Sequence, residues 1–235
     1  MQKICYLIAF LFVTNICISQ TAEELFNNGN SKYQIKDYKG AIDDFTKVIE
    51  IYPSLAEAYF NRGNAKNEIQ DNKGAISDYT TAIDLKPEYI EAYSNRALAK
   101  HDLQDYEGEI TDLTAALKIN PSYPEIYFNR GIAKSHIQDH SGAIIDYTKA
   151  IDLHPNYEDA YFNRGMTRID LKEVQKAIID FNKVIEINPK FAQAYYNRGI
   201  AKVELTQLNS GCLDLRKALE LGDAMASDAI KKHCK

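Results

Sequence analysis

The sequence has no tryptophan, and its 235 residues include only six prolines and eleven glycines. It also lacks any excess of positive charge, because 28 Lys and Arg residues against 33 Asp and Glu residues give a formal net charge of −5. Without a basic field, nothing draws the chain to nucleic acid or to an anionic membrane surface, so we predict neither as a partner. The 45% hydrophobic content is typical of a folded protein.

Signatures of catalysis are absent as well. The sequence shows no Gly-rich phosphate loop, nucleophile elbow or pair of catalytic acids, so we predict that the chain is not an enzyme and needs no cofactor. His136 and His140 are four residues apart, and His101 lies about one repeat before His136. No clean third and fourth ligand follows at the usual spacing, so we interpret these histidines as solvated side chains and predict no metal site.

Residues 1–19 have the order of a secretory signal peptide. Met1 to Lys3 carry one positive charge, Ile4 to Val13 are mostly apolar, and Cys17 and Ser19 place small side chains before a cut after residue 19. The apolar run is shorter than the ~20 residues of a membrane-spanning helix. We therefore predict a periplasmic or secreted protein that is not inserted in a membrane after cleavage. The alternative is a protein anchored through this segment, left uncleaved.

The remaining chain repeats with a period of 34 residues. The phrase Tyr-Phe-Asn-Arg-Gly occurs at 59–63, 127–131 and 161–165, with variants at 93–97 and 195–199. Most units end with a Pro, and a Gly-rich or Asp-rich stretch interrupts each unit midway, which predicts two helices per unit. Six units fill residues 20–222, and residues 223–235 are predicted to form a capping helix. The units begin at Ala22, Ala56, Ile90, Pro124, Glu158 and Ala192.

This pattern resembles the tetratricopeptide repeat family, whose units place small and aromatic residues at fixed positions. The resemblance implies an all-α, right-handed superhelical solenoid of six helix-turn-helix repeats plus the C-terminal cap, with first helices lining a concave groove. The third unit departs from the family pattern at Ala97 and Glu109, so we expect looser packing there or an exposed Glu109. The matching residues in the second and fifth units are Tyr59, Gly63, Ala75, Tyr79, Ala82 and Pro87, and Tyr161, Gly165, Ala177, Phe181 and Pro189.

Two charged residues recur in register. The seventh place of units two to six holds Arg and the twenty-third place of every unit holds Asp. Unit one keeps Asp44 but has Asn28 instead of Arg, so we predict that each Asp pairs with the Arg of the following unit and that Lys232 serves the last Asp. Such partly buried pairs would set the stacking geometry; the alternative is a basic binding stripe. The residues are Asp44, Arg62, Asp78, Arg96, Asp112, Arg130, Asp146, Arg164, Asp180, Arg198 and Asp214.

The sixth place is Asn in every unit, and the resemblance implies that this place lines the groove. An amide can hydrogen-bond an extended backbone whatever its side chains are; the alternative is that each Asn bonds a neighbouring turn or helix. Aromatic residues at place five and apolar residues at place nine share this helix face and are predicted anchors. The predicted groove residues are Asn61, Asn95, Asn129, Asn163, Asn197, Phe60, Phe128, Phe162, Tyr196, Ile132 and Met166.

Only Cys212 and Cys234 follow the signal segment. They lie about equally far from the turn at Gly222, so we predict a disulfide between them, with two free thiols as the alternative.

We therefore predict an exported scaffold that binds an extended segment of another polypeptide in its groove, since acidic residues beside the groove favour an apolar segment with some positive charge. A structural subunit that docks into an envelope assembly through its convex face or cap is the alternative. A third possibility is an accessory domain with a small-molecule pocket. No oligomeric state is predicted.

Overall fold

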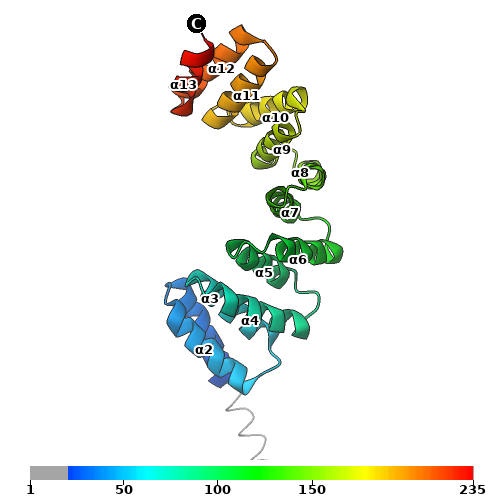
Figure 1. Cartoon of the computed structure of the whole chain (residues 1–235). Coiled ribbons are helices and arrows are strands. Elements are labelled where there is room, and N and C mark those ends of the chain that lie inside the picture. The colour runs from blue at the N-terminus through cyan, green and yellow to red at the C-terminus, as the bar shows by residue number, and fades with distance from the viewer. Residues whose placement is uncertain (1–20, 235) are drawn as a thin grey trace, which may run out of the picture. The chain divides into compact units, whose positions relative to one another are not determined.

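The computed structural model describes residues 21–234, and all regular secondary structure in that range is helical. The predicted signal segment, residues 1–19, lies outside the described residues. The chain divides after Ile119 into two compact units. Each unit is built of helical hairpins, seen as paired ribbons in Figure 1.

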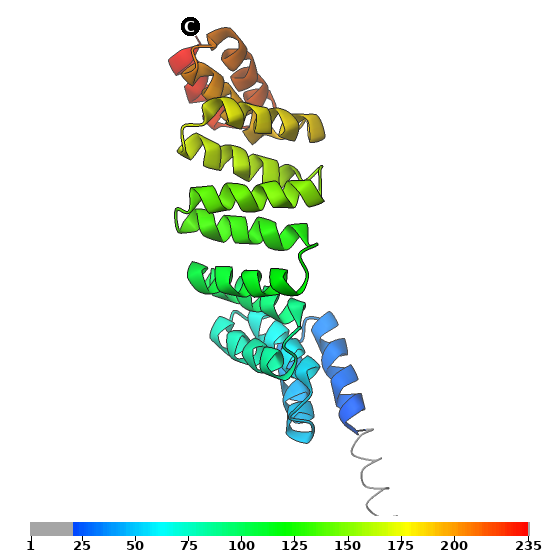
Figure 2. The ribbon, with the colours of Figure 1, turned by 90° about the vertical axis from the view of Figure 1, so that its right-hand side faces the viewer.

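Unit 1 holds hairpins one to three, and unit 2 holds hairpins four to six and the cap. In unit 1, a helix at residues 21–34 is followed by α2 (Tyr38–Ile51), α3 (Ala56–Glu68), α4 (Asn72–Leu85), α5 (Ile90–Asp102) and α6 (Tyr106–Ile119). In unit 2 the helices are α7 (Pro124–His136), α8 (His140–Leu153), α9 (Glu158–Asp170), α10 (Val174–Ile187), α11 (Ala192–Glu204), α12 (Leu208–Glu220) and α13 (Met225–His233). Figure 2 shows α7 to α10 as successive layers of one stack. The predicted repeat boundaries therefore coincide with the starts of the first helices to within one residue.

The turn inside each hairpin has the same backbone conformation. Place fifteen adopts a left-handed φ of 61° to 64° although it is never Gly, as at Gln70 and Gln138. The next residue is Asp in hairpins one to four, and its carboxylate accepts a hydrogen bond from a Gly main-chain N–H three residues on, as Asp71 does from Gly74 at 3.0 Å. This N-cap starts the second helix at a defined residue.

The two helices of a hairpin approach closely because a Gly at place eight faces an aromatic ring at place twenty-four. A Cβ added to Gly63 would lie 2.7 Å from the ring of Tyr79, and one added to Gly131 would lie 2.7 Å from the ring of Tyr147. The third hairpin has Ala97 at place eight and the smaller Leu113 at place twenty-four, and both are buried. Hairpin six also has a Leu at place twenty-four, Leu215, but keeps Gly199 opposite it, so Ala97 gives hairpin three the one methyl group at place eight.

The predicted pairing of each Asp with the Arg of the following unit is wrong. Arg62 donates from Nε and Nη2 to both carboxylate oxygens of Asp78, in its own hairpin, at 2.9 and 2.7 Å. The same bidentate pair forms within hairpins three to six. Places seven and twenty-three are equally distant from the turn at place fifteen, so the antiparallel helices bring them face to face. We call this contact the Arg–Asp clamp.

A second cation completes each clamp from place eleven. Lys66 lies 2.8 Å from Asp78, and Lys202 lies 2.7 Å from Asp214. Asp214 is therefore served by Arg198 and Lys202, and the predicted role of Lys232 is wrong. In hairpin one, which lacks the Arg, Lys32 pairs with Asp44 from this place at 2.6 Å, and the exposed Lys47 lies 3.8 Å from the same carboxylate. This explains why Asn28 can replace Arg there, an exception that suggested the wrong pairing.

The same Arg also reaches the preceding hairpin. Nη1 of Arg62 donates to Oγ1 of Thr46 at 3.1 Å, and Nη1 of Arg164 donates to Oγ1 of Thr148 at 3.0 Å. The guanidinium lies over a Tyr ring one turn earlier in its own helix, 5.6 Å from the centroid in the case of Tyr59. One buried guanidinium therefore joins the two helices of its hairpin and links that hairpin to its neighbour.

Glu109 is buried, contrary to the expectation that it is exposed. Its side chain accepts a hydrogen bond from Nδ1 of His101 at 2.8 Å, and the residue is 4% exposed. Burial raises the pKa of the Glu109 carboxyl, and the hydrogen bond from His101 partly opposes that rise. The corresponding residues are Ala41, Ala75, Ala143 and Ala177, all fully buried.

The last hairpin is covered by α13, which buries Ala226 and Ala229, whereas Ala224 is exposed. The Sγ atoms of Cys212 and Cys234 lie 2.00 Å apart, with their Cα atoms 5.6 Å apart, so the structure joins the end of the cap to α12 by a disulfide.

Removing one carboxylate of a clamp should be far more costly than removing an exposed ion pair. Asp146→Ala removes the carboxylate that Arg130 and Lys134 share in a largely buried site, at an expected cost of about 3–5 kcal/mol in the free energy of unfolding. The control is Lys231→Ala, which breaks a pair with Asp228 that is exposed on both sides and should change stability by less than about 0.5 kcal/mol. Urea denaturation followed by circular dichroism measures both, and equal losses would contradict a structural role for the clamp.

Substitutions in the His101–Glu109 pair should have unequal effects. His101→Ala leaves a buried carboxylate without its donor and should cost about 1–3 kcal/mol near neutral pH. Glu109→Ala installs the residue that hairpins one, two, four and five have at this place and should cost less or stabilise. Because the folded-state pKa of Glu109 is raised above 4.5, its contribution to stability is present below that pH and is lost as pH rises through the folded value. Thermal denaturation as a function of pH tests this. As pH rises through the folded-state pKa of Glu109, the Tm of the Glu109→Gln variant should increase relative to that of the wild type.

Candidate peptide-binding face

Successive first helices lie side by side within each unit, α3 against α5 and α7 against α9. Their outward sides carry places two, six, nine and thirteen, which we call the first-helix face. It contains the Asn residues and the place-nine residues that the sequence predicts to line a groove.

The first-helix face is hollowed in both units, at corresponding residues. In unit 1, a cavity of about 200 Å³ lies between hairpins one and two, and in unit 2 a cavity of about 250 Å³ lies between hairpins four and five. Both are lined by places nine, twelve, thirteen and twenty-four of one hairpin and places six and nine of the next. The lining residues in unit 2 are Ile132, Ser135, His136, Tyr147, Asn163, Met166, Thr167 and Asp170.

The cavities show which predicted residues the structure brings together. Ile132, Asn163 and Met166 line one cavity, and Asn61 lines the other. Places twelve and thirteen were not predicted as lining residues, although the acidic residues at place thirteen are recognisable in the sequence on the same helix face. The helix period of the sequence does not show how much of the helix surface remains uncovered once the neighbouring hairpin packs against it.

The Asn amides behave differently in the two units. In unit 1, Nδ2 of Asn61 donates to Oδ1 of Asn30 at 3.0 Å, and Nδ2 of Asn95 donates to Oδ1 of Asn64 at 2.8 Å. These bonds join neighbouring hairpins, as the alternative interpretation of the Asn residues supposed, and they occupy the amide donors.

In unit 2 the place-nine residues are apolar and offer the amides no such acceptor. Nδ2 of Asn163 donates instead to the main-chain oxygen of Asp159, and Nδ2 of Asn197 to that of Gln193, at 3.0 and 2.9 Å. Asn129 is exposed. Because a helix carbonyl already accepts a main-chain hydrogen bond, these amides can turn to a ligand at small cost.

The aromatic residues at place five are packing residues first. Phe60 lies with its ring centroid 5.9 Å from that of Tyr79 and 4.8 Å from that of Tyr89, and it packs against two core clusters. Phe128 and Phe162 make the equivalent contacts, and Tyr196, like these three, is only partly exposed. The prediction that these rings are groove anchors is corrected in this respect, because most of their surface is used inside the stack.

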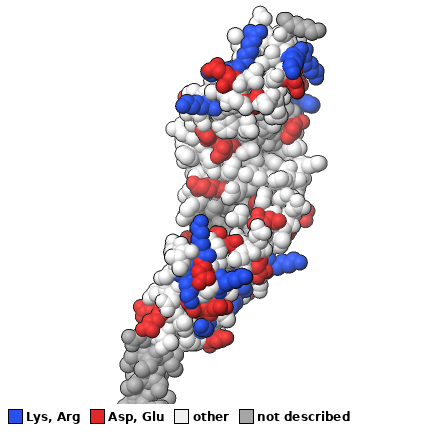
Figure 3. All heavy atoms as spheres, turned by 90° about the vertical axis from the view of Figure 1, so that its left-hand side faces the viewer, with Lys and Arg blue, Asp and Glu red and all other residues white. Residues whose placement is uncertain are grey.

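The first-helix face is acidic because its cations turn inward. Arg and Lys at places seven and eleven are bound in the clamps, whereas the acids at places two and thirteen, such as Glu125, Asp159 and Asp170, remain exposed or partly exposed. In Figure 3, the face over the middle of the chain shows red carboxylates and hardly any blue. The exposed charge of the first-helix face is therefore mainly negative.

A second exposed feature of unit 2 lies on its second helices. Place twenty-two holds Ile145, Ile179 and Leu213, which are 67%, 59% and 65% exposed. The same place in unit 1 is polar, with Asp43, Ser77 and Thr111. We call the three apolar residues the second-helix row.

Within residues 21–234, no group of three or more His, Cys, Asp or Glu side chains is placed to hold a metal ion. In that same range, none of the helices is both long and apolar enough to span a bilayer.

These features define the class of the protein as a helical-repeat protein with an open, ligand-accessible face. Family models described as TPR repeat match residues 29–70, 63–104 and 99–135, and models described as tetratricopeptide repeat match residues 124–157 and 158–191. The chain belongs to the tetratricopeptide repeat family, as its sequence pattern predicts. The sixth hairpin lies beyond the matched residues but keeps the Arg198–Asp214 clamp.

Several solved structures share this fold. YrrB, described as a TPR protein with an unusual peptide-binding site, is 23% identical, with a TM-score of 0.71 over 80% of this chain and 97% of that chain. MamA is 27% identical, with a TM-score of 0.67 over 70% of this chain and 96% of its own. MamA from Desulfovibrio magneticus RS-1 is 18% identical, with a TM-score of 0.69 over 73% and 97%. No curated protein matches the sequence.

Proposed function

We propose that the protein is an exported, non-catalytic scaffold that binds an extended segment of another polypeptide on the first-helix face of unit 2. The observation that carries this proposal is the cavity between α7 and α9, where an apolar floor, an amide and a carboxylate converge. Ile132 and Met166 supply the floor, Asn163 the amide and Asp170 the charge. YrrB, a structural neighbour described as having a peptide-binding site, supports a binding role for this fold.

The chemistry of the cavity favours a particular kind of segment. An apolar side chain of the ligand fills the floor, the Asn amides bond its main chain, and the acids attract a neighbouring Lys or Arg. The face of hairpins one and two suits this less well, because their place-nine residues Asn30 and Asn64 are polar and already bond the amides of the next hairpin.

A random dodecapeptide library displayed on phage and selected on residues 20–235 tests this proposal. Selected peptides should combine apolar residues with Lys or Arg, and their affinity should fall as salt rises. Ile132→Asn with Met166→Asn, which copies place nine of unit 1, should weaken binding about thirtyfold or more by fluorescence anisotropy. Asn129→Ala with Asn163→Ala should weaken it less, and Asn61→Ala with Asn95→Ala should leave it unchanged.

The second-helix row favours a different function, docking into an assembly through the outer helices. The matched variant is Ile145→Ser with Ile179→Ser, which copies Ser77 of unit 1. If this variant abolishes binding and the first-helix variants do not, the row is the docking surface and the proposal for the first-helix face is wrong.

Export is proposed from the signal-like residues 1–19, and the disulfide agrees with an oxidising compartment. Protein recovered from the periplasm or medium of an expressing bacterium should have the intact mass of a chain that begins at Gln20. That mass should be smaller by two hydrogen atoms than the mass of the reduced form. Reduction should lower stability by roughly 3 kcal/mol in the loop-entropy account, and Cys234→Ser should remove this sensitivity to reductant. Retention of residues 1–19 in the membrane fraction would instead support the anchored alternative.

A further inference from the structure

A third cavity, of about 510 Å³, lies elsewhere in unit 1, between the helix at residues 21–34, the end of α2 and the start of α3. Its lining is mostly apolar, and Val48 and Ala22 at its base are buried. The lining residues are Ala22, Glu23, Phe26, Val48, Tyr52, Ser54, Leu55 and Glu57. None of them belongs to the peptide-binding cavity of unit 2.

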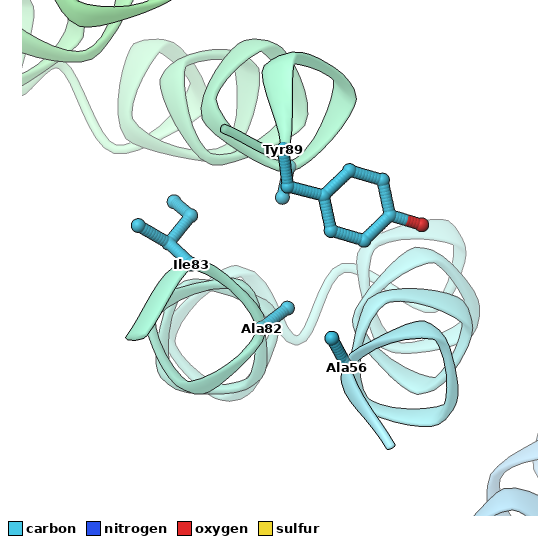
Figure 4. Close-up of a cluster of buried hydrophobic side chains, with 5 residues drawn as sticks. Ala56, Ala82, Ile83 and Tyr89 are labelled. Atoms are coloured by element: carbon cyan, nitrogen blue, oxygen red, sulfur yellow. The ribbon is translucent and has the colours of Figure 1, made fainter. Parts of the chain in front are cut away.

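Other hairpins fill the corresponding space with an aromatic ring of their own. The ring comes from place thirty-four and lies on the Phe at place five. The centroid distances are 4.8 Å for Phe60 and Tyr89, 4.9 Å for Phe128 and Tyr157, and 5.1 Å for Phe162 and Phe191. Figure 4 shows Tyr89 lying over Ala56 and Ala82, the hairpin-two residues that correspond to Ala22 and Val48.

Hairpin one has the surface on which this ring packs in the other hairpins, but it lacks the ring. Phe26 occupies place five as in hairpins two, four and five, yet place thirty-four is Leu55. Leu lacks the flat surface that covers the Phe in the other hairpins, and a cavity remains. Tyr52, at place thirty-one, borders the same space. In hairpins two and four the residues at place thirty-one also lie beside the ring at place thirty-four: Lys86 is 4.4 Å from the ring centroid of Tyr89, and the ring centroid of His154 is 5.3 Å from that of Tyr157. The cavity therefore has aromatic side chains on two sides.

The mouth of the cavity is acidic. Glu23 and Glu57 line it, and the lining includes no basic residue. Glu57 lies 3.3 Å from Lys86, but both side chains are about half exposed, so this pair is weak. In hairpin two, the equivalent acids Glu57 and Glu91 help burial to raise the pKa of Tyr89 to about 12, which shows that charges at place two act on a ring at this position.

We propose that this cavity is a binding site for an aromatic side chain of a partner polypeptide, a Tyr or Phe flanked by Lys or Arg. The ring occupies the position that Tyr89 and Tyr157 occupy in their hairpins, and the flanking cations lie at Glu23 and Glu57. The volume exceeds that of one ring, so the main chain that carries the ring also fits. The site is independent of the first-helix face of unit 2.

Titration of residues 20–235 with four probes tests the proposal, with chemical shifts of the Val48 and Leu55 methyl groups as the readout. Tyramine should bind more tightly than p-cresol, and p-cresol more tightly than 4-hydroxyphenylacetate, because the mouth is negative. The capped tripeptide Lys-Tyr-Lys should bind more tightly than tyramine. No binding, or tightest binding by the acid, would overturn the proposal; binding of tyramine without the tripeptide would show that the ligand is a free amine and not a polypeptide.

Variants separate this site from the rest of the molecule. Leu55→Tyr restores the ring of the other hairpins, so it should raise Tm and weaken tripeptide binding at least tenfold. Leu153→Tyr, at an exposed position of unit 2, is the matched control and should change neither. If Leu55→Tyr fails to fold, Phe26→Leu provides the second test, with the same expected loss of binding. Unchanged binding in a folded Leu55→Tyr or Phe26→Leu protein would overturn the proposal, while the phage-selected peptides should bind these variants normally.

Discussion

The buried Arg–Asp clamp is the contact on which the other features of this structure depend. A bidentate guanidinium and carboxylate, with exposures of 12–16% and 1–9%, fix the two helices of a hairpin in one register. Because the guanidinium also reaches the preceding hairpin, that register is passed on to the stacking, as between Arg62 and Thr46. In a repeat protein, where each hairpin contacts only its neighbours, such a contact has to recur in each hairpin.

The clamp also decides which charges remain available for binding. It uses cations from the middle of the first helix and leaves the acids at the ends of that helix on the surface. The same helix therefore holds the hairpin together with one side and presents carboxylates on the other. Unit 2 adds apolar residues at place nine, so that Ile132 and Met166 lie beside Asn163 and Asp170. The contacts that hold the hairpin together and the exposed carboxylates thus lie on different faces of one helix.

The repeat period, the starts of the first helices and the family could be predicted from the sequence, because Gly, Pro and aromatic residues recur every 34 residues. The partner of each Asp was predicted wrongly, although places seven and twenty-three lie equally far from the turn at place fifteen. The exception at Asn28 pointed the wrong way, because Lys32 at place eleven still pairs with Asp44 where the Arg is absent. The packing of Phe60 and the burial of Glu109 were also missed. Both depend on contacts with a second hairpin or helix, and the periodicity of a single helix gives no information about such contacts.

The inward orientation of the clamp cations has an effect beyond binding. A net charge of −5 understates the negative potential at the surface, because many of the positive charges lie beneath it. Two copies of the protein therefore repel each other over about a Debye length, roughly 8 Å at physiological ionic strength. Anionic polymers are repelled in the same way. At low ionic strength, the negative surface therefore slows association with other anionic macromolecules and speeds association with cationic ones.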